Sequence, residues 1–173
     1  MSPRPYTVSF VCTGNICRSP IGEVVLRDLL TQADLPMPVS VISAGTGDWH
    51  VGGPADPRAL ATLTEFGHDG AAHRARQFTR DSFAEADLVL ALDRSHEQAL
   101  RRMAPTPEDA AKVRLLRSFD PDAVAAGELE VDDPYFGEDA GFRRTYEEVL
   151  AACHGVVEHL RQVLATMDAA AEH

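Results

Sequence analysis

The chain has 173 residues, of which 45% are hydrophobic and 25% are charged, and its formal net charge is −11. This length fits one domain, and the composition excludes a collagen, a coiled coil and a wholly disordered chain. The negative charge argues against nucleic-acid binding through a broad basic face, so an anionic substrate must meet a local positive site. We expect no membrane span, because no apolar run approaches the roughly 18 residues that one needs.

The N-terminal segment and the cysteine content favour a cytoplasmic protein. Residues 1–5 lack the long apolar stretch of a secretory signal peptide. Three cysteines, Cys12, Cys17 and Cys153, are too few and too unevenly spaced for a disulfide framework. The histidines show no metal-ligand spacing with cysteine or acidic residues, so we expect no metal site and no cofactor.

Strand and helix patterns alternate along the chain. Strands are expected at residues 7–12, 39–44, 86–92 and 113–116, and helices at about 19–29, 56–67, 95–103 and 142–164. Asp56 is a good N-cap and Gly67 a natural C-cap for the second helix. The alternation predicts one α/β domain over residues 1–173, ordered from about 6 to 167, with a four-stranded parallel sheet and helices on both faces. Residues 119–141 form a long acidic connection, and such loops are usually functional or disordered.

The most informative stretch joins the first strand to the first helix, and reads Cys12-Thr13-Gly14-Asn15-Ile16-Cys17-Arg18-Ser19-Pro20. Ligands of such folds bind at the carboxyl ends of strands, where a loop above a helix N-terminus turns its amides toward an anion. Gly14 supplies backbone freedom, and Asn15 tolerates the left-handed conformation of a tight loop.

Two side chains of this loop have the chemistry of phosphoryl transfer. Arg18 presents a planar fork of donors that matches two phosphate oxygens. Cys12 lies where oriented amides and the helix end favour the thiolate. A lone cysteine on a buried strand is usually core filler, and a lone arginine at a helix start is usually solvated. The complete strand–loop–helix context favours a phosphate-binding loop with a cysteinyl-phosphate intermediate.

The loop resembles the active-site loop of the low-molecular-weight protein tyrosine phosphatases, whose pattern is Cys-x5-Arg-Ser near the N-terminus. The resemblance covers essentially the whole chain in the right order. Further stretches that resemble the family are residues 43–49, 51–52, 55–59, 73–77, 92–93 and the Asp-Pro-Tyr motif within residues 132–135. The chain is identified on these motifs as a bacterial member, which implies metal-independent hydrolysis of phosphotyrosine.

The resemblance implies that Asp133 of the Asp-Pro-Tyr motif lies over Cys12 as the general acid. A phenolate leaving group has a conjugate acid with a pKa near 10 and needs a proton to leave quickly. Pro134 restricts Asp133 to extended backbone geometry, and the same carboxylate then serves as the base for water. The neighbouring Asp132 is the competing candidate.

The resemblance assigns supporting roles to other residues. Ser19 is expected to donate its hydroxyl to the sulfur of Cys12, although a serine there is also a plain N-cap. Asn15 is expected to be held by Ser43 and His73, although a loop histidine often has no special role. Cys17 is expected to form a protective disulfide with Cys12 under oxidants.

Aromatic residues are expected to wall the substrate pocket. Trp49 and Tyr135 resemble the walls of a deep slot above the loop, although an isolated tryptophan is more often core. Phe136 stands where many relatives carry a second tyrosine. Ile16 favours phosphotyrosine, because the related protein arginine phosphatases carry threonine at this point.

Three alternative functions remain at this point. An arsenate reductase of the same fold needs further cysteines, and none lies between Cys17 and Cys153. The others are a phosphoarginine phosphatase and a catalytically silent phosphate-binding module. The expected partners are phosphotyrosine-bearing proteins, including substrates of a bacterial tyrosine kinase, and we expect a monomer that binds neither nucleic acid nor membrane.

Overall fold

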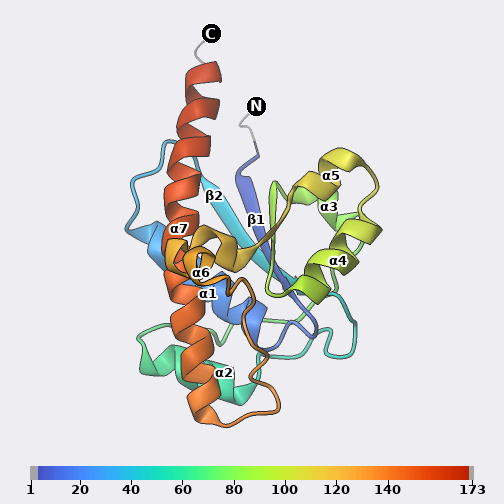
Figure 1. The fold of residues 1–173 in the computed structure, drawn as a ribbon, viewed down its shortest axis with the longest axis vertical. Helices are drawn as coiled ribbons and strands as arrows, with labels where there is room; N and C mark the ends of the chain where they lie inside the picture. The colour runs from blue at the N-terminus through green and yellow to red at the C-terminus, as the bar shows by residue number, and fades with distance from the viewer. Residues whose placement is uncertain (1–3, 172–173) are drawn as a thin grey trace.

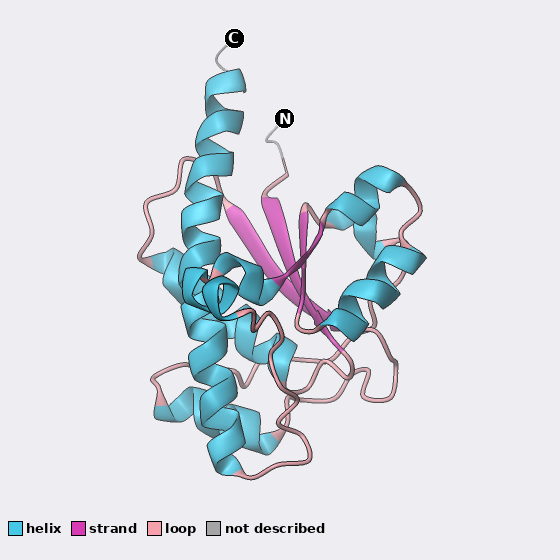
Figure 2. Ribbon diagram, in the orientation of Figure 1, coloured by secondary structure: helices cyan, strands magenta, loops and turns pink. Residues whose placement is uncertain are grey.

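The structure, a computed structural model, is a parallel β-sheet between two layers of helices (Figures 1 and 2). It describes residues 4–171, so residues 1–3 and 172–173 of the predicted domain lie outside the described residues. The sheet has the order β2-β1-β3-β4 and all its pairs are parallel. Its strands are β1 (Tyr6–Cys12), β2 (Val39–Gly45), β3 (Leu88–Ala91) and β4 (Val113–Leu115). The predicted fold class is confirmed.

Helices cover both faces of the sheet. In Figure 1, α1, α2, α6 and α7 lie on one side, and α3, α4 and α5 on the other. Their bounds are α1 (Arg18–Thr31), α2 (Pro57–Glu65), α3 (Ser82–Glu85), α4 (Arg94–Met103), α5 (Pro107–Ala111), the 3-10 turn η1 (Leu116–Phe119), α6 (Pro121–Ala126) and α7 (Asp139–Ala171). Among residues 4–171, none of these helices combines the length and the apolar character needed to cross a bilayer.

The structure corrects several predicted boundaries. The connection at 119–141 is not a continuous loop, because it contains the end of η1, the whole of α6 and the start of α7. The last helix extends beyond 142–164 at both ends, and β3 is shorter than the predicted strand at 86–92. Short helices such as α3 and α5 contain too few residues to show a 3.6-residue repeat, so periodicity does not reveal them.

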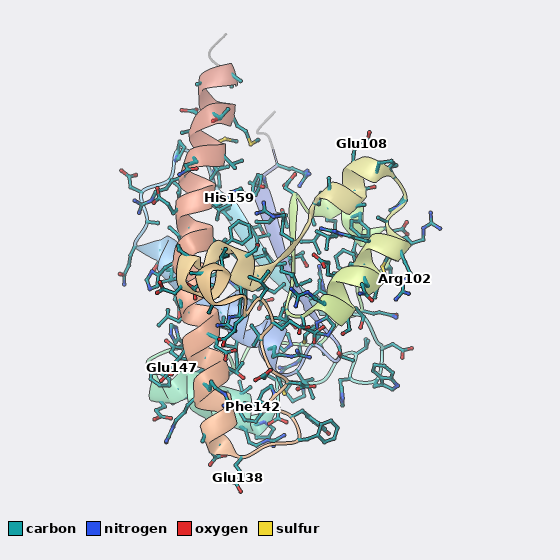
Figure 3. The ribbon with its side chains drawn as sticks, viewed as in Figure 1. Arg102, Glu108, Glu138, Phe142, Glu147 and His159 are labelled. Atoms are coloured by element: carbon teal, nitrogen blue, oxygen red, sulfur yellow. The ribbon has the colours of Figure 1, made fainter. Side chains whose placement is uncertain are left out.

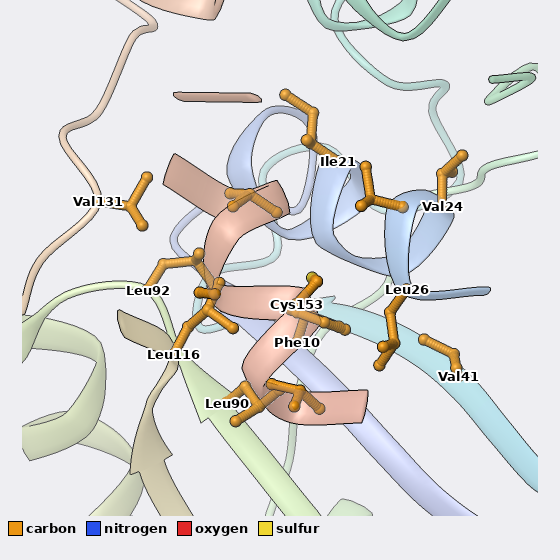
Figure 4. Packing of buried hydrophobic residues seen from close by; sticks show 14 of the residues in the cluster. Phe10, Ile21, Val24, Leu26, Val41, Leu90, Leu92, Leu116, Val131 and Cys153 are labelled. Carbon is orange, nitrogen blue, oxygen red and sulfur yellow. The ribbon is translucent and has the colours of Figure 1, made fainter. Parts of the chain in front are cut away.

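The hydrophobic core is divided by the sheet into two clusters. Side chains of β1 alternate between them: Phe10 packs on the side of α1 and α7, and Val11 on the side of α4. Figure 4 shows the larger cluster, in which Phe10, Ile21 and Cys153 converge from a strand and two helices. Charged side chains such as Arg102, Glu108 and Glu147 lie on the outer surface (Figure 3).

The sheet order creates a crevice at the carboxyl end of β1. β2 and β3 pair with opposite edges of β1, with Cys12 opposite Gly45 and Val11 opposite Ala91. After β1, the chain forms β2 on one side of it and later β3 on the other side. This change of side is the topological switch point where α/β sheets bind ligands. The predicted phosphate-binding loop lies at this point.

Two glycines of α7 differ in how closely other parts of the chain pack against them. A Cβ at Gly155 would overlap the Phe119 carbonyl of η1, whereas the nearest atom to a Cβ at Gly141 is Pro134 Cβ at 3.9 Å. We expect Gly155→Ala to lower the free energy of unfolding by about 3 kcal/mol, because backbone must move. Gly141→Ala should raise it by about 0.5 kcal/mol through helix propensity. Urea denaturation of both variants measures this, and equal effects would contradict the packing described.

Candidate active site

The loop after β1 directs its carbonyl groups away from the crevice. The Cys12 and Thr13 carbonyls accept hydrogen bonds from the amides of Thr46 and Gly47, at 2.9 and 3.0 Å. The Ile16 carbonyl accepts one from the Asp56 amide at 2.8 Å. Because each peptide plane places its carbonyl and amide on opposite sides, carbonyls tied outward leave the loop amides to line the crevice. This arrangement favours an anion.

Asn15 fixes the curvature of the loop. Its φ of 57° is left-handed, and among residues 4–171 no other non-glycine residue has a positive φ. Its fully buried side chain accepts a hydrogen bond from the Arg76 amide at 2.9 Å and donates to the hydroxyls of Ser19 and Ser43 at 2.8 and 2.9 Å. These bonds compensate for a backbone conformation that a side chain disfavours.

The predicted support residues Ser43 and His73 both contact Asn15. His73 Nε2 donates to the Asn15 carbonyl at 2.7 Å, and Ser43 Oγ donates to Glu23 Oε1 at 3.0 Å. Burial raises the pKa of Glu23, but the nearby His73 and Arg27 and the hydrogen bond from Ser43 outweigh it, so the pKa lies below its ordinary value. Sequence reasoning did not select Glu23, although it lies one helical turn after Ser19.

Ser19 Oγ lies 2.9 Å from Cys12 Sγ, and both side chains are buried. Since Ser19 Oγ accepts the hydrogen bond from Asn15 Nδ2, its own hydrogen is available for the sulfur. Its other acceptor, the Ala44 carbonyl, is farther away at 3.4 Å. The hydroxyl is therefore oriented to stabilise negative charge on Cys12.

Arg18 is 3% exposed and is held by the elements on both sides of the crevice. Its Nη1 donates to Asp93 Oδ2 at 2.8 Å and to the Val131 carbonyl at 2.9 Å. Among residues 4–171, no other hydrogen bond of this guanidinium is present, which leaves Nε and Nη2 for the oxygen atoms of a bound anion.

Asp93 connects Arg18 to the N-terminus of α4. One carboxylate oxygen accepts from Arg18, and the other accepts from Ser95 Oγ at 2.6 Å and from the His96 amide at 3.1 Å. Burial opposes ionisation, but these hydrogen bonds and the nearby His96 lower the pKa of Asp93 to about 2. Asp93 was only part of a motif in the sequence, and its role as the partner of Arg18 was missed.

Asp133 lines the crevice, and Asp132 does not. Asp133 Oδ2 lies 3.6 Å from Arg18 Nη2, and Oδ1 accepts from the Tyr135 amide at 3.1 Å. Asp132 instead lines a separate surface hollow with Arg117 and Glu148. Of the two candidate acids, the structure therefore brings only Asp133 to the loop.

The cleft above the loop has a volume of about 210 Å³. It is lined by Cys12, Thr13, Gly14, Ile16, Cys17, Arg18, Trp49, His50, Asp133, Tyr135 and Phe136. The aromatic residues stand at its mouth: Trp49 is 72% exposed and Phe136 is 90% exposed. Tyr135 and Phe136 pack edge to face, with ring centroids 4.9 Å apart. A cleft with aromatic residues at its mouth suits a flat aromatic ring.

Arg58 holds the aromatic segment in place and was not selected from the sequence. It forms a bidentate pair with Asp56, donates to the Gly137 carbonyl at 3.2 Å and lies 5.5 Å from the centroid of the Tyr135 ring. In the sequence it was only part of the family-like stretch at residues 55–59, directly after the Asp56-Pro57 helix start. His50 was also missed. Its ring packs close to Gly14 of the loop, where a Cβ would lie only 3.1 Å from His50 Cδ2.

The second cysteine of the loop differs chemically from a reactive thiol. Cys17 is buried, and burial together with the negative charge of Asp56 raises the pKa of its thiol to about 12. Cys17 is therefore protonated at neutral pH. Within residues 4–171, no group of three or more histidine, cysteine or acidic residues is arranged to hold a metal ion.

Comparison with known proteins gives the same result over most of the chain. The family profile described as low molecular weight phosphotyrosine protein phosphatase matches residues 7–166. A low molecular weight protein-tyrosine-phosphatase of Streptomyces coelicolor is 54% identical over 157 residues, which cover 91% of this chain and 94% of that relative. Low molecular weight protein-tyrosine phosphatase A of Mycobacterium tuberculosis is 43% identical over 161 residues, which cover 93% and 95%.

A solved structure agrees with these sequences. The crystal structure of a protein tyrosine phosphatase from Entamoeba histolytica superposes with a TM-score of 0.84 at 28% identity, and the match covers 91% of this chain and 97% of that chain. The chain therefore belongs to the low molecular weight phosphotyrosine protein phosphatase family, as its motifs predicted.

Proposed function

We propose that this protein hydrolyses phosphotyrosine in proteins through a cysteinyl-phosphate on Cys12. The observation that carries the proposal is the cleft itself, in which Cys12, the buried Arg18 and Asp133 line one aromatic-walled space. Family membership makes the chain a protein phosphatase. The contacts described above support the role that we propose for each residue in the two steps.

In the first step, the Cys12 thiolate attacks phosphorus and forms an S–P bond while the bond between phosphorus and the tyrosine oxygen breaks. The phenolate oxygen receives a proton from the Asp133 carboxylic acid. Arg18 Nε and Nη2, together with the loop amides, bind the equatorial oxygens of the phosphoryl group.

In the second step, water attacks phosphorus and the S–P bond breaks. The Asp133 carboxylate takes the proton of the water, and inorganic phosphate leaves. The electron pair returns to the sulfur of Cys12, where the hydroxyl of Ser19 stabilises it at 2.9 Å. The step needs neither a redox partner nor a metal.

The other functions considered from the sequence are less well supported. A relay of disulfides, as in an arsenate reductase, lacks a third thiol near the cleft, because Cys153 is fully buried on α7. A silent module has no use for the oriented Ser19 hydroxyl. The apolar Ile16 in the cleft wall favours a phenyl ring over a guanidinium. Parallel assays with phosphotyrosine and phosphoarginine distinguish a tyrosine phosphatase from an arginine phosphatase.

The partners follow from the same chemistry. We propose that the substrates are proteins phosphorylated by a bacterial tyrosine kinase, and that the protein acts as a monomer in the cytoplasm. The aromatic mouth of the cleft is exposed, so a phosphotyrosine side chain that projects from a protein surface can enter it.

The nucleophile is tested by Cys12→Ser. Hydrolysis of p-nitrophenyl phosphate in the presence of a chelator should fall at least about a thousandfold, because an unactivated hydroxyl replaces a thiolate. Cys153→Ser is the matched control and should keep the wild-type rate in folded protein. Activity that survives in Cys12→Ser would remove this residue from the chemistry.

The general acid is tested by comparing two neighbouring carboxyls. Asp133→Asn should lower kcat for a phosphotyrosine peptide about a hundredfold, and Asp132→Asn should stay within about twofold because its side chain faces another hollow. An aryl phosphate with a more acidic phenol should lose less in Asp133→Asn, since its anion leaves without a proton. A slower Asp132→Asn enzyme would reverse the assignment.

A protective disulfide between Cys12 and Cys17 is tested with peroxide. Peroxide oxidises the Cys12 thiolate to a sulfenic acid, and Cys17 then displaces hydroxide, which leaves as water after taking a proton. Because the pKa of Cys17 is about 12, its thiolate fraction rises tenfold per pH unit below that value. Closure after one equivalent of peroxide should therefore accelerate from pH 6 to pH 8, as measured by mass spectrometry of alkylated protein.

The control for this reaction is Cys17→Ser. Excess peroxide should inactivate this variant irreversibly, whereas a reducing agent should restore the wild-type enzyme. Equal recovery of both proteins would show that Cys17 does not protect the nucleophile.

A further inference from the structure

The first turn of α4 contacts both ends of the phosphate-binding loop. Asp93, the N-cap of α4, binds Arg18 at the end of the loop. Three residues later, His96 Nε2 lies 2.8 Å from the hydroxyl of Thr13 at the start of the loop. His96 is 2% exposed. One helical turn therefore holds a residue at each end of the loop, and the reaction steps derived above do not use His96.

The surroundings of His96 determine which of its nitrogens carries the proton. Burial, aided by Arg18, lowers the pKa of His96 to about 4 against the opposing effects of Asp93, Asp133 and Glu130, so the ring is neutral at pH 7. Nδ1 is buried without a hydrogen-bond partner among residues 4–171 and lies 3.3 Å from Asp93 Oδ1. A bare nitrogen lone pair there would face a carboxylate oxygen, so the hydrogen belongs on Nδ1.

This tautomer gives Nε2 the role of acceptor. The Thr13 hydroxyl then donates its hydrogen to His96. Thr13 is also held through its carbonyl, which accepts from the Gly47 amide at 3.0 Å. These two hydrogen bonds hold the side chain and the carbonyl of Thr13 and so restrain the peptide planes on either side of it, next to the cleft that Thr13 lines.

We propose that His96 is a positioning residue that acts through the Thr13 hydroxyl to preorganise the phosphate-binding loop. The proposal rests on the proposed function of the cleft. It differs from the role of Asp93, which acts on the guanidinium. In this arrangement, α4 sets the direction of the loop amides at one end and the position of Arg18 at the other.

A double-mutant cycle tests the coupling of these two side chains. The variants are His96→Leu, Thr13→Val and the combination of both, each assayed for kcat and KM with p-nitrophenyl phosphate and for inhibition by inorganic phosphate. Each single variant should lose about fivefold to tenfold in kcat/KM and bind phosphate more weakly by a similar factor. The double variant should be no worse than the more impaired single variant, because both changes remove the same interaction.

Two conservative variants and one control separate positioning from stability. Thr13→Ser keeps the hydroxyl and should retain most of the activity, and His96→Gln places an amide oxygen or nitrogen near the position of Nε2 and should recover part of it. His68 is a second largely buried histidine with two hydrogen bonds, 2.6 Å to Asp28 and 2.8 Å to Tyr146. His68→Leu should lower the thermal midpoint while leaving phosphate inhibition unchanged.

Two results would overturn the proposal. One is a Thr13→Val enzyme with wild-type kcat/KM and phosphate inhibition, a result that does not depend on whether His96→Leu folds. The other is a double variant in which the two losses multiply. Neither result touches the proposed function, which fails only if wild-type activity is absent or survives the loss of the Cys12 thiol.

Discussion

The buried guanidinium of Arg18 is the constraint on which the site depends. A charge that is 3% exposed is costly unless it is paired and hydrogen-bonded. Asp93 supplies the opposite charge and Val131 supplies a carbonyl, so three chain segments far apart in sequence must meet at Nη1. The loop after β1, the first turn of α4 and the segment that bears Asp133 are thereby fixed relative to one another.

A negative protein can bind a dianion because the local field at the loop opposes the field of the whole molecule. The net charge of −11 repels phosphate at long range. At the loop, carbonyl groups are turned outward and tied to Thr46, Gly47 and Asp56, so the amides and one guanidinium place positive charge next to the anion site. Such dipoles are oriented before substrate arrives and cost no reorganisation during the reaction.

Gly45 allows the end of β2 to pack against the phosphate-binding loop after β1. A Cβ at Gly45 would lie 2.7 Å from the Thr13 carbonyl oxygen and 3.1 Å from the Asn15 amide nitrogen. Only a residue without a side chain lets the end of β2 pack directly against the loop, where its neighbours Thr46 and Gly47 donate to the loop carbonyls. The strand pairing of Cys12 with Gly45 thus leads directly to the shape of the anion site.

The sequence predicts what depends on local pattern and misses what depends on contacts between distant segments. The buried strands, the long amphipathic helix and the loop from Cys12 to Arg18 were readable because periodicity and loop chemistry are local. The partnership of Asp93 with Arg18 and that of His96 with Thr13 require β1 and β3 to be neighbours, which no local pattern encodes.

Two of the missed short helices, α5 and α6, had a readable signal of another kind. Thr106-Pro107 and Asp120-Pro121 begin α5 and α6 in the way that Asp56-Pro57 begins α2, with a capping side chain followed by proline. Gly127, with a φ of 71°, ends α6. Capping residues therefore predict helices of one or two turns, where a search for hydrophobic periodicity does not.

The segment that bears Asp133 shows how an irregular loop can hold a reactive group accurately. The side chain of Val131 is buried in the larger core cluster (Figure 4), its amide donates to the Leu92 carbonyl at 2.8 Å, and its own carbonyl accepts from Arg18. Two residues later, Asp133 is fixed again by the Tyr135 amide. The core and the guanidinium therefore determine together where the carboxyl lies, so the distance between the anion site and the proton donor is set by packing rather than by regular secondary structure.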